Sequence, residues 1–204
     1  MEECISVFDM LKIGVGPSSS HTLGPWRAAE LFLKELRDQI LIPKIDNIKV
    51  DLYGSLSLTG KGHATDLALM LGLSGQDPEY IPVENIATII KEIEDRNEIN
   101  LGAEKRIPFY FLQDIIFNKN FLPFHANGLT FTAVLNDGSS YSSTFYSIGG
   151  GFVVKEERAN AKKKSTIKCA FPYPIVKASE LLAYCTEENK SISERVILPR
   201  SHYT

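Results

Sequence analysis

The segment from Leu129 to Ile148 constrains the fold most, because its pattern is that of two β-strands joined by a tight turn. Apolar and polar side chains alternate along residues 129–135, as in a strand with one buried face. Asn136-Asp137-Gly138 follows, and aspartate and glycine tolerate the positive φ angles of a hairpin turn. Residues 141–148, which end at three glycines, then predict the return strand, so we expect an antiparallel hairpin.

Helix and strand patterns precede this hairpin. Residues 25–40 predict an amphipathic helix whose buried stripe is Trp26, Ala29, Leu33, Leu36 and Ile40. Period-two alternation predicts a strand at 47–53, and further apolar runs predict a small-residue helix at 64–72, a helix at 83–96 and a strand at 109–112. We therefore expect an α+β fold with a mixed, largely antiparallel sheet and helices packed on one face, followed by a short helical C-terminal extension.

A charge-rich segment at 155–168 marks the end of this first domain. It is nearly free of apolar residues, which is typical of a solvated linker or edge. We expect a first domain over 1–160, a linker over 161–174, and the start of a second, helical domain over 175–204. Ser191 and Glu194 have the spacing of a capping box and predict the start of a helix there.

Composition excludes several function classes. The chain has 22 Lys and Arg against 25 Asp and Glu, so no basic excess supports nucleic-acid binding. Its apolar runs fall far short of the roughly 20 residues that span a bilayer, and residues 1–20 lack the pattern of a signal peptide. Cys4, Cys169 and Cys185 form no C-x-x-C pair, which indicates reduced thiols in a cytoplasmic protein.

The first candidate site is the loop Gly16–Thr22, which opens a helix. Three consecutive serines precede His21 in it. Free N–H groups and hydroxyls at the start of a helix suit a carboxylate or a phosphate, and a histidine can move a proton near neutral pH. The alternative is a structural role in which the serines only cap the helix, but one serine suffices for that. The pattern therefore favours binding by Ser18, Ser19, Ser20 and Thr22.

The second candidate is the glycine-rich turn Gly54–His63. Glycines on either side of Lys61 permit a close approach of the backbone to a ligand, and His63 begins the next helix. A glycine rather than a hydroxyl residue follows Lys61, so this is not a Walker A loop. Such turns are common in purely structural settings, but the repeat of glycine, hydroxyl and histidine in two loops favours function. The loops at 124–128 and 147–151 are weaker candidates, since turn or bulge chemistry explains them.

In their order along the chain, these loops resemble the iron–sulfur-dependent L-serine dehydratases. The matching pieces are Gly16–Thr22 with Gly24-Pro25, Gly54-Ser55-Leu56, Thr59–His63, His125 with Asn127-Gly128, and Tyr146–Phe152. A single motif of this kind is weak, whereas five in one order are specific. The resemblance implies that residues 5–155 form the N-terminal β domain of that family. It also implies that 171–197 are the junction and first helices of its catalytic α domain.

The resemblance further implies a reaction and a cofactor. In that family the α domain supplies the cysteines of a [4Fe–4S] cluster, and one iron acts as a Lewis acid on the hydroxyl of L-serine. Loss of the Cα proton and of hydroxide gives aminoacrylate, which hydrolyses to pyruvate and ammonia. The cluster cysteines have no match here, so we expect no cofactor in this chain alone and a catalytic α domain or subunit as its partner. A homo-oligomer is also expected. A fragment, a frameshifted product and a true subunit all remain open.

Site roles follow from the needs of an elimination. The reaction requires a base at Cα and acid assistance for the departing hydroxide. His63 is the expected base, with His21 as the second choice. The expected substrate-binding residues are Ser18, Ser19, Ser20, Thr22, Lys61 and Asn127, and no metal ligand is expected. Two other functions stay open: a module that senses serine or another small carboxylate, and a structural remnant with neither role.

Overall fold

The computed structural model describes residues 14–157 and 177–196, with side chains to residue 194. The chain divides into two compact units, one of Ile5–Lys162 and one of Met1–Cys4 with Lys163–Thr204. The predicted linker, 161–174, lies outside the described residues. No helix in the two described ranges is long and apolar enough to cross a bilayer.

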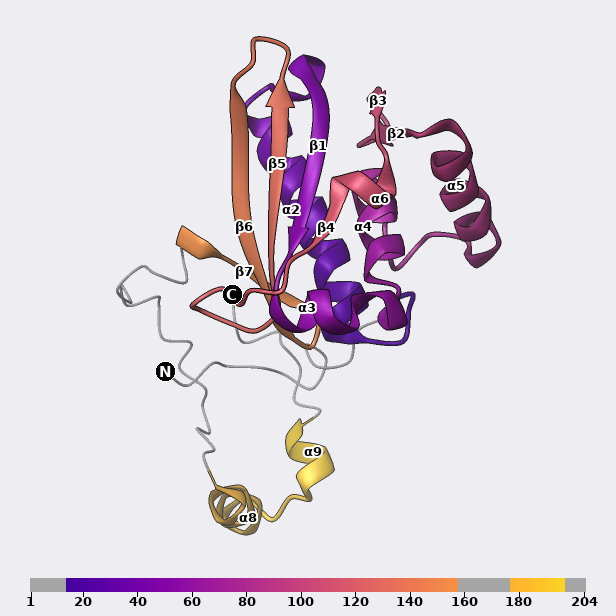
Figure 1. Ribbon diagram of the computed structural model, residues 1–204. Helices are drawn as coiled ribbons and strands as arrows, with labels where there is room; N and C mark the ends of the chain where they lie inside the picture. The colour runs from indigo at the N-terminus through magenta and orange to yellow at the C-terminus, as the bar shows by residue number, and fades with distance from the viewer. Residues whose placement is uncertain (1–13, 158–176, 197–204) are drawn as a thin grey trace. The chain divides into compact units, whose positions relative to one another are not determined.

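A five-stranded sheet forms the centre of the first unit (Figure 1). Its strands, in spatial order, are β4 (Ile115–Phe117), β1 (Ile45–Leu52), β5 (Gly128–Leu135), β6 (Ser140–Gly149) and β7 (Phe152–Lys155). Only the β1–β4 pair of this sheet is parallel, so the predicted mixed and largely antiparallel sheet is confirmed. The hairpin predicted from alternation corresponds to β5 and β6.

Helix α2 (Gly24–Asp38) packs on one face of this sheet. The rings of Phe32 and Phe131 stack with their centroids 4.9 Å apart, joining the helix to β5. Trp26, Leu33 and Leu36 are buried as predicted. Ile40 differs from the prediction, because the helix ends at Asp38 and Ile40 adopts a φ of 55° with its side chain 75% exposed.

The two faces of the sheet differ in chemistry. On the face toward α2, alternate residues of β1 and β5 are buried and apolar. On the other face, cross-strand hydroxyls pair at 2.8 Å between Thr130 and Thr144 and at 2.9 Å between Thr132 and Ser142. Cross-strand pairs of this kind stabilise the hairpin and keep its register.

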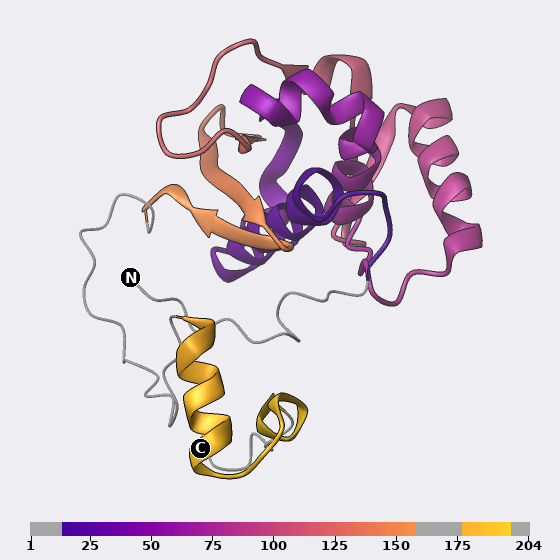
Figure 2. The ribbon, with the colours of Figure 1, turned by 90° about the horizontal axis from the view of Figure 1, so that it is seen from below.

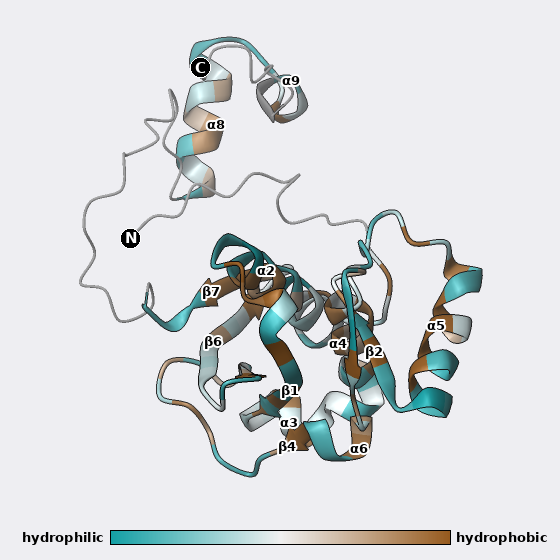
Figure 3. Ribbon diagram, turned by 90° about the horizontal axis from the view of Figure 1, so that it is seen from above, coloured by the Kyte–Doolittle hydropathy of each residue, from teal (hydrophilic) through white to brown (hydrophobic). Residues whose placement is uncertain are grey.

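Helices α4 (Thr65–Leu73) and α5 (Val83–Arg96) form a second layer. Almost every side chain of α4 is apolar and buried, and this helix packs against α2. Helix α5 packs against α4 and against β2 (Glu98–Leu101), which pairs with β3 (Lys105–Pro108) in a separate two-stranded sheet. Figure 3 shows the apolar residues of α5 on the side toward α4. The expectation that helix 83–96 packs on the main sheet was therefore wrong, because α4 lies between them.

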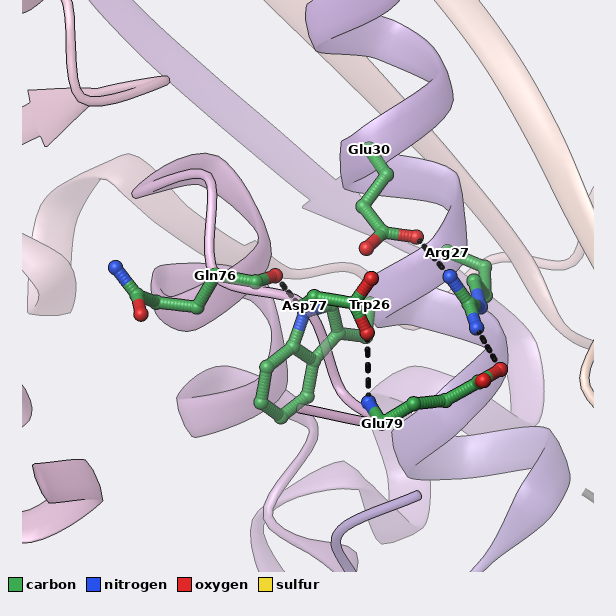
Figure 4. Close-up of polar contacts among 6 residues, drawn as sticks. All are labelled: Trp26, Arg27, Glu30, Gln76, Asp77 and Glu79. Carbon is green, nitrogen blue, oxygen red and sulfur yellow. Dashed lines mark hydrogen bonds and ion pairs between the residues drawn. The ribbon is translucent and has the colours of Figure 1, made fainter. Parts of the chain in front are cut away.

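The connection between α4 and α5 is anchored to α2 by polar contacts (Figure 4). The indole nitrogen of Trp26 donates to the backbone oxygen of Gln76 at 2.8 Å. The guanidinium of Arg27 bridges the carboxylates of Glu30 and Glu79. These bonds fix the loop after α4 against the first turns of α2.

Two local predictions need correction. The segment 109–112 is not a strand: Phe111–Asp114 form the short helix α6, whose first turn is held by a hydrogen bond from the Tyr110 N–H to the buried Asp114 carboxylate at 2.7 Å. The segment Gly54–His63 is not an open turn, since it forms helix α3 (Gly54–Thr59) and a 3-10 turn (Gly60–His63). Strand β7 was not predicted, because its last residue, Lys155, begins the charge-rich segment at 155–168.

The second unit contains helices α8 (Ala178–Glu187) and α9 (Ile192–Val196), in agreement with the predicted helical extension. The capping box is present: the Ser191 N–H donates to the Glu194 carboxylate at 2.8 Å, and the Glu194 N–H donates to Ser191 Oγ at 3.3 Å. Leu182 is exposed as expected of a poorly anchored helix, whereas Cys185 is buried. The Val196 side chain and Ile197 lie outside the description.

Candidate functional site

Four segments meet where α2 begins, at one end of the main sheet, which Figure 2 views from below. They are the π-helical turn Ser19–Leu23, the start of α3, the connection before β5, and the end of β6. Gly54 makes one close approach possible. Its φ is +54°, and a Cβ there would lie 2.3 Å from the backbone oxygen of Ala126, so only glycine fits.

The three serines of the first loop have different roles. Ser18 caps the turn, since its Oγ accepts a hydrogen bond from the His21 N–H at 3.1 Å. Ser20 Oγ lies 2.9 Å from His21 Nδ1 and 3.4 Å from Ser18 Oγ. Ser19 is exposed, and its hydroxyl has no hydrogen-bond partner among the described residues. One serine therefore suffices for capping, and the Ser19 hydroxyl is available to a ligand.

His21 lies between two hydroxyls. Its Nδ1 contacts Ser20 Oγ and its Nε2 contacts Ser55 Oγ, each at 2.9 Å. Burial lowers the pKa of His21 from its ordinary 6.5, and the nearby imidazole of His63 lowers it further. A neutral ring that bridges two hydroxyls is therefore the expected form at neutral pH.

Hydrogen bonds close a circuit through the four segments. Ser147 Oγ donates to the backbone oxygen of Ser20 at 2.7 Å, and the side-chain amide of Asn127 donates to the backbone oxygen of Ser147 at 3.1 Å. The Ser55 N–H donates to the oxygen of Ala126, next to Asn127, at 2.8 Å. With the two bonds of His21, the circuit joins all four segments and fixes the position of the imidazole.

One ring nitrogen of His63 has a hydrogen-bond partner among the described residues and the other has none. Its Nδ1 lies 3.0 Å from the backbone oxygen of Thr59. A carbonyl oxygen can only accept, so Nδ1 carries a hydrogen, and in the neutral imidazole the lone pair is on Nε2. No described residue forms a hydrogen bond with Nε2. The rings of His21 and His63 lie with their centroids 5.0 Å apart, so the structure brings together the two predicted histidines.

The other predicted binding residues are placed differently. Lys61 is exposed, with its Nζ 5.4 Å from the centroid of the Phe117 ring and no contact to the circuit. The Asn127 side chain is buried and holds Ser147. Thr22 is also buried, and its hydroxyl donates to the backbone oxygen of His63 at 2.7 Å. Their roles in substrate binding stay predictions.

Three residues of the arrangement were missed by sequence reasoning: Ser55, Thr65 and Ser147. Ser147 is fully buried and closes the circuit, and Thr65 is fully buried and donates to the backbone oxygen of His21 at 2.5 Å. The signal for Ser55 was its place directly after Gly54 at the end of a strand. The partners of the other two lie more than 40 residues away along the chain, so no local pattern reveals them.

Large apolar side chains are exposed on the same segments. They are Leu58 on α3, Phe121 and Phe124 before β5, and Ile148 at the end of β6. The Phe124 ring also contacts that of Tyr146, with centroids 4.9 Å apart. Exposed apolar residues beside polar groups are typical of surfaces that bind a partner.

The described residues do not fit an iron–sulfur cluster. Cys185 is the one cysteine within 14–157 and 177–196, and no three His, Cys, Asp or Glu side chains in these ranges converge as metal ligands would. Such clusters need several thiolates. Any cluster thiolates would have to come from outside these ranges, and no step of the mechanism below is routed through one.

Comparison with known proteins assigns the chain to a family. The family described as "Serine dehydratase beta chain" matches residues 6–158, so the chain belongs to that family. It is 44% identical over 191 residues to L-serine dehydratase 1 of Escherichia coli K12, which covers 93% of this chain and 41% of the relative. It is 40% identical to L-serine dehydratase of Streptomyces coelicolor, with 93% and 42% covered. The chain thus spans about two-fifths of the length of these relatives.

Proposed function

We propose that this chain supplies the proton-transfer group and part of the serine-binding site of an L-serine dehydratase, which converts L-serine to pyruvate and ammonia. The observation that carries the proposal is the histidine pair, with centroids 5.0 Å apart and the His63 Nε2 unengaged. The names of the relatives support the substrate, and the match over 6–158 includes both histidines.

His63 is the base in this proposal. Its Nε2 takes the proton from Cα of serine, while the bond to the Thr59 oxygen holds the tautomer and the ring plane. Hydroxide then leaves Cβ with acid assistance, and the resulting aminoacrylate hydrolyses to pyruvate and ammonia. His21 is the less favoured base, because both of its ring nitrogens already contact serine hydroxyls.

Ser19 is the first carboxylate-binding group in this proposal. It is exposed and its hydroxyl is unengaged among the described residues, whereas Ser18 and Ser20 already contact other groups. Lys61 adds a positive charge on a long, exposed side chain that can approach a carboxylate. Asn127 contributes by donating its side-chain amide hydrogen bond to the backbone oxygen of Ser147, and does not bind the substrate directly.

A partner completes the site in this proposal. A [4Fe–4S] cluster held by a catalytic α domain or subunit would polarise the serine hydroxyl when bound. The exposed Phe121, Phe124 and Leu58 give that partner an apolar surface to cover. The sequence offers three cysteines in all, so we expect the chain to be inactive without such a partner.

Pyruvate release from L-serine tests the proposal. The 204-residue chain alone is expected to release none. A chain completed with the remaining part of the E. coli relative is expected to release pyruvate from L-serine and not from D-serine. Absence of pyruvate from the completed, cluster-loaded chain would contradict the proposal. Saturable serine binding with no turnover in either form would instead favour a serine-sensing module, the alternative function of the same loops.

A further inference from the structure

Two threonines join the histidine-bearing segments by hydrogen bonds that run in opposite directions. Thr22, the residue after His21, donates to the backbone oxygen of His63 at 2.7 Å. Thr65, two residues after His63, donates to the backbone oxygen of His21 at 2.5 Å. The carbonyl of each histidine is therefore held by a hydroxyl that follows the other histidine in the sequence.

Both threonines are packed too tightly to serve a ligand directly. Thr22 is 3% exposed and Thr65 is 0% exposed. A Cβ on Gly16 would lie 2.3 Å from Cγ2 of Thr22, so glycine there leaves the room that this side chain fills. Since a buried hydroxyl without a partner is unfavourable, each of these side chains has a strong reason to keep its bond.

The backbone directly after His63 also needs support. Ala64 has a φ of 55°, a left-handed conformation that is unfavourable for a residue with a side chain. This residue turns the chain from His63 into α4. Such a conformation persists where surrounding contacts fix it, and the Thr65 bond to His21 is one of those contacts.

We propose that Thr65 is a positioning residue, which sets the distance between the His21 and His63 rings by holding the backbone oxygen of His21. The effect of Thr65 on catalysis rests on the proposed function. The effect of Thr65 on the distance between the two rings can be measured in a chain that has no activity. The Ser20 and Thr59 contacts orient each ring within its own segment, and the Ser55 contact joins the His21 ring to the start of α3, eight residues before His63. The Thr65 bond, by contrast, acts on the His21 backbone from the residues that directly follow His63.

Three variants separate positioning from simple stability. Thr65→Val keeps the β-branched shape and removes the hydroxyl, and Thr65→Ser restores the hydroxyl. Ser74→Ala is the matched control, because Ser74 is another buried hydroxyl that donates to a backbone oxygen, that of Met70 at 2.7 Å, beside the far end of α4. The control removes a comparable bond and leaves the histidines untouched.

The first readout is the through-space NMR contact between the imidazole C–H groups of His21 and His63 in the 204-residue chain. We expect Thr65→Val to weaken this cross-peak several-fold, and Thr65→Ser and Ser74→Ala to retain it. An unchanged cross-peak in folded Thr65→Val would overturn the proposal. If that variant does not fold, Thr65→Cys takes its place, because a thiol is of similar size and only a weak donor; a weakened cross-peak is expected, and an unchanged one overturns the proposal as well.

The second readout is the turnover of L-serine by the completed, cluster-loaded enzyme. Thr65→Val is expected to lower kcat by roughly 10- to 100-fold with KM changed less than about 3-fold, because a displaced base costs rate rather than binding. Equal losses in Thr65→Val and Ser74→Ala would overturn the positioning role. If the wild-type enzyme releases no pyruvate, the proposed function fails, while the NMR contact still decides the role of Thr65.

Discussion

Glu35 and Lys155 form an ion pair between the last turn of α2 and the last residue of β7, with Oε1 and Nζ 3.0 Å apart. The second oxygen of Glu35 accepts hydrogen bonds from Tyr141 at 3.0 Å and Ser143 at 2.6 Å, both on β6. One carboxylate thus joins the helix to two neighbouring strands. Lys155, the first residue of the charge-rich segment, is thus the last residue of the edge strand β7.

This relationship predicts a stability effect. Glu35→Ala leaves two hydroxyls without their acceptor, and the partly buried Lys155 ammonium keeps the exposed Glu157 carboxylate, 3.6 Å away. The free energy of unfolding is therefore expected to fall by about 2–3 kcal/mol. Urea unfolding followed by circular dichroism measures the change. Lys34→Ala on the same helix, an exposed residue without an ion pair, is the control and should change stability by less than about 0.5 kcal/mol. Equal effects of the two variants would contradict the role given to Glu35.

The position of Gly24 predicts a steric effect. Its φ is −60°, so the backbone accepts any residue, but a Cβ there would lie 1.9 Å from Ser147 Oγ. Gly24→Ala is therefore expected to destabilise the fold by about 1–3 kcal/mol through overpacking, and to displace Ser147 from Ser20. Thermal unfolding measures this. Gly62→Ala serves as the matched control, since a Cβ on Gly62 meets nothing within 4 Å. Tolerance of Gly24→Ala without loss of stability would count against the packing described at this end of the sheet.

The lowered pKa of His21 predicts a pH dependence of stability. A histidine whose pKa is depressed by folding binds fewer protons in the folded than in the unfolded chain, so its contribution is present above pH 6.5 and is lost as the pH falls through the folded pKa. We expect the free energy of unfolding to decrease with acidification below pH 6.5 and His21→Gln to flatten that dependence. Urea unfolding of both proteins between pH 7.5 and pH 5 compares the slopes. Identical slopes would show that the His21 ring titrates normally in the fold.

The free Nε2 of His63 predicts a catalytic effect. In a completed enzyme, His63→Ala should lower kcat by ~10²–10⁴-fold with little change in the affinity for serine, because a general base acts in the transition state. Steady-state pyruvate release measures both parameters. His21→Ala is the comparison, and it should be milder. The reverse order of severity would exchange the two assignments, and two silent variants would mean that this domain is regulatory.

The unengaged hydroxyl of Ser19 predicts a binding effect instead. Ser19→Ala should raise KM for serine by roughly 10- to 100-fold with little change in kcat, because a hydrogen bond to a charged carboxylate contributes about 1.5–3 kcal/mol. The same pyruvate assay measures it. Thr59→Ala is a control on a neighbouring segment, where the hydroxyl bonds the backbone of its own helix. An unchanged KM for Ser19→Ala would remove Ser19 from the binding site.

The strands that alternate strictly were predictable from sequence, whereas the layer of helices was not. β1 and β5 have one apolar and one polar face, and that period identifies them without tertiary information. β6 does not alternate strictly and was predicted from the turn that precedes it. Helix α4 is apolar all round, so its pattern does not show which element it faces. The sequence therefore did not show that α5 packs on α4. For the same reason, α5 was wrongly predicted to pack on the main sheet.

The candidate site was predictable as loops but not as a network. His21 and His63 stand in loops whose glycines and hydroxyls are visible in the sequence. Thr65 and Ser147 donate hydrogen bonds to backbone oxygens. Because every residue has a backbone oxygen, the residue type at the partner position does not indicate that such a bond forms. The bond from Asn127 to Ser147 was not predictable for the same reason. Asn127-Gly128 is typical of a turn, and that pattern does not indicate a distant hydrogen-bond partner.

The hydrogen-bond circuit has a consequence for the order of folding. It joins Ser20, near the start of the described chain, to Ser147 on β6. In chain order, β6 is the fourth strand of the main sheet, and only β7 follows it. Contacts between residues so distant in sequence form late, because a long loop must close before they are gained. A ribosome-bound chain that has not yet emerged past β6 therefore cannot close this circuit. The position of the His21 imidazole is therefore fixed only after β6 has been synthesised.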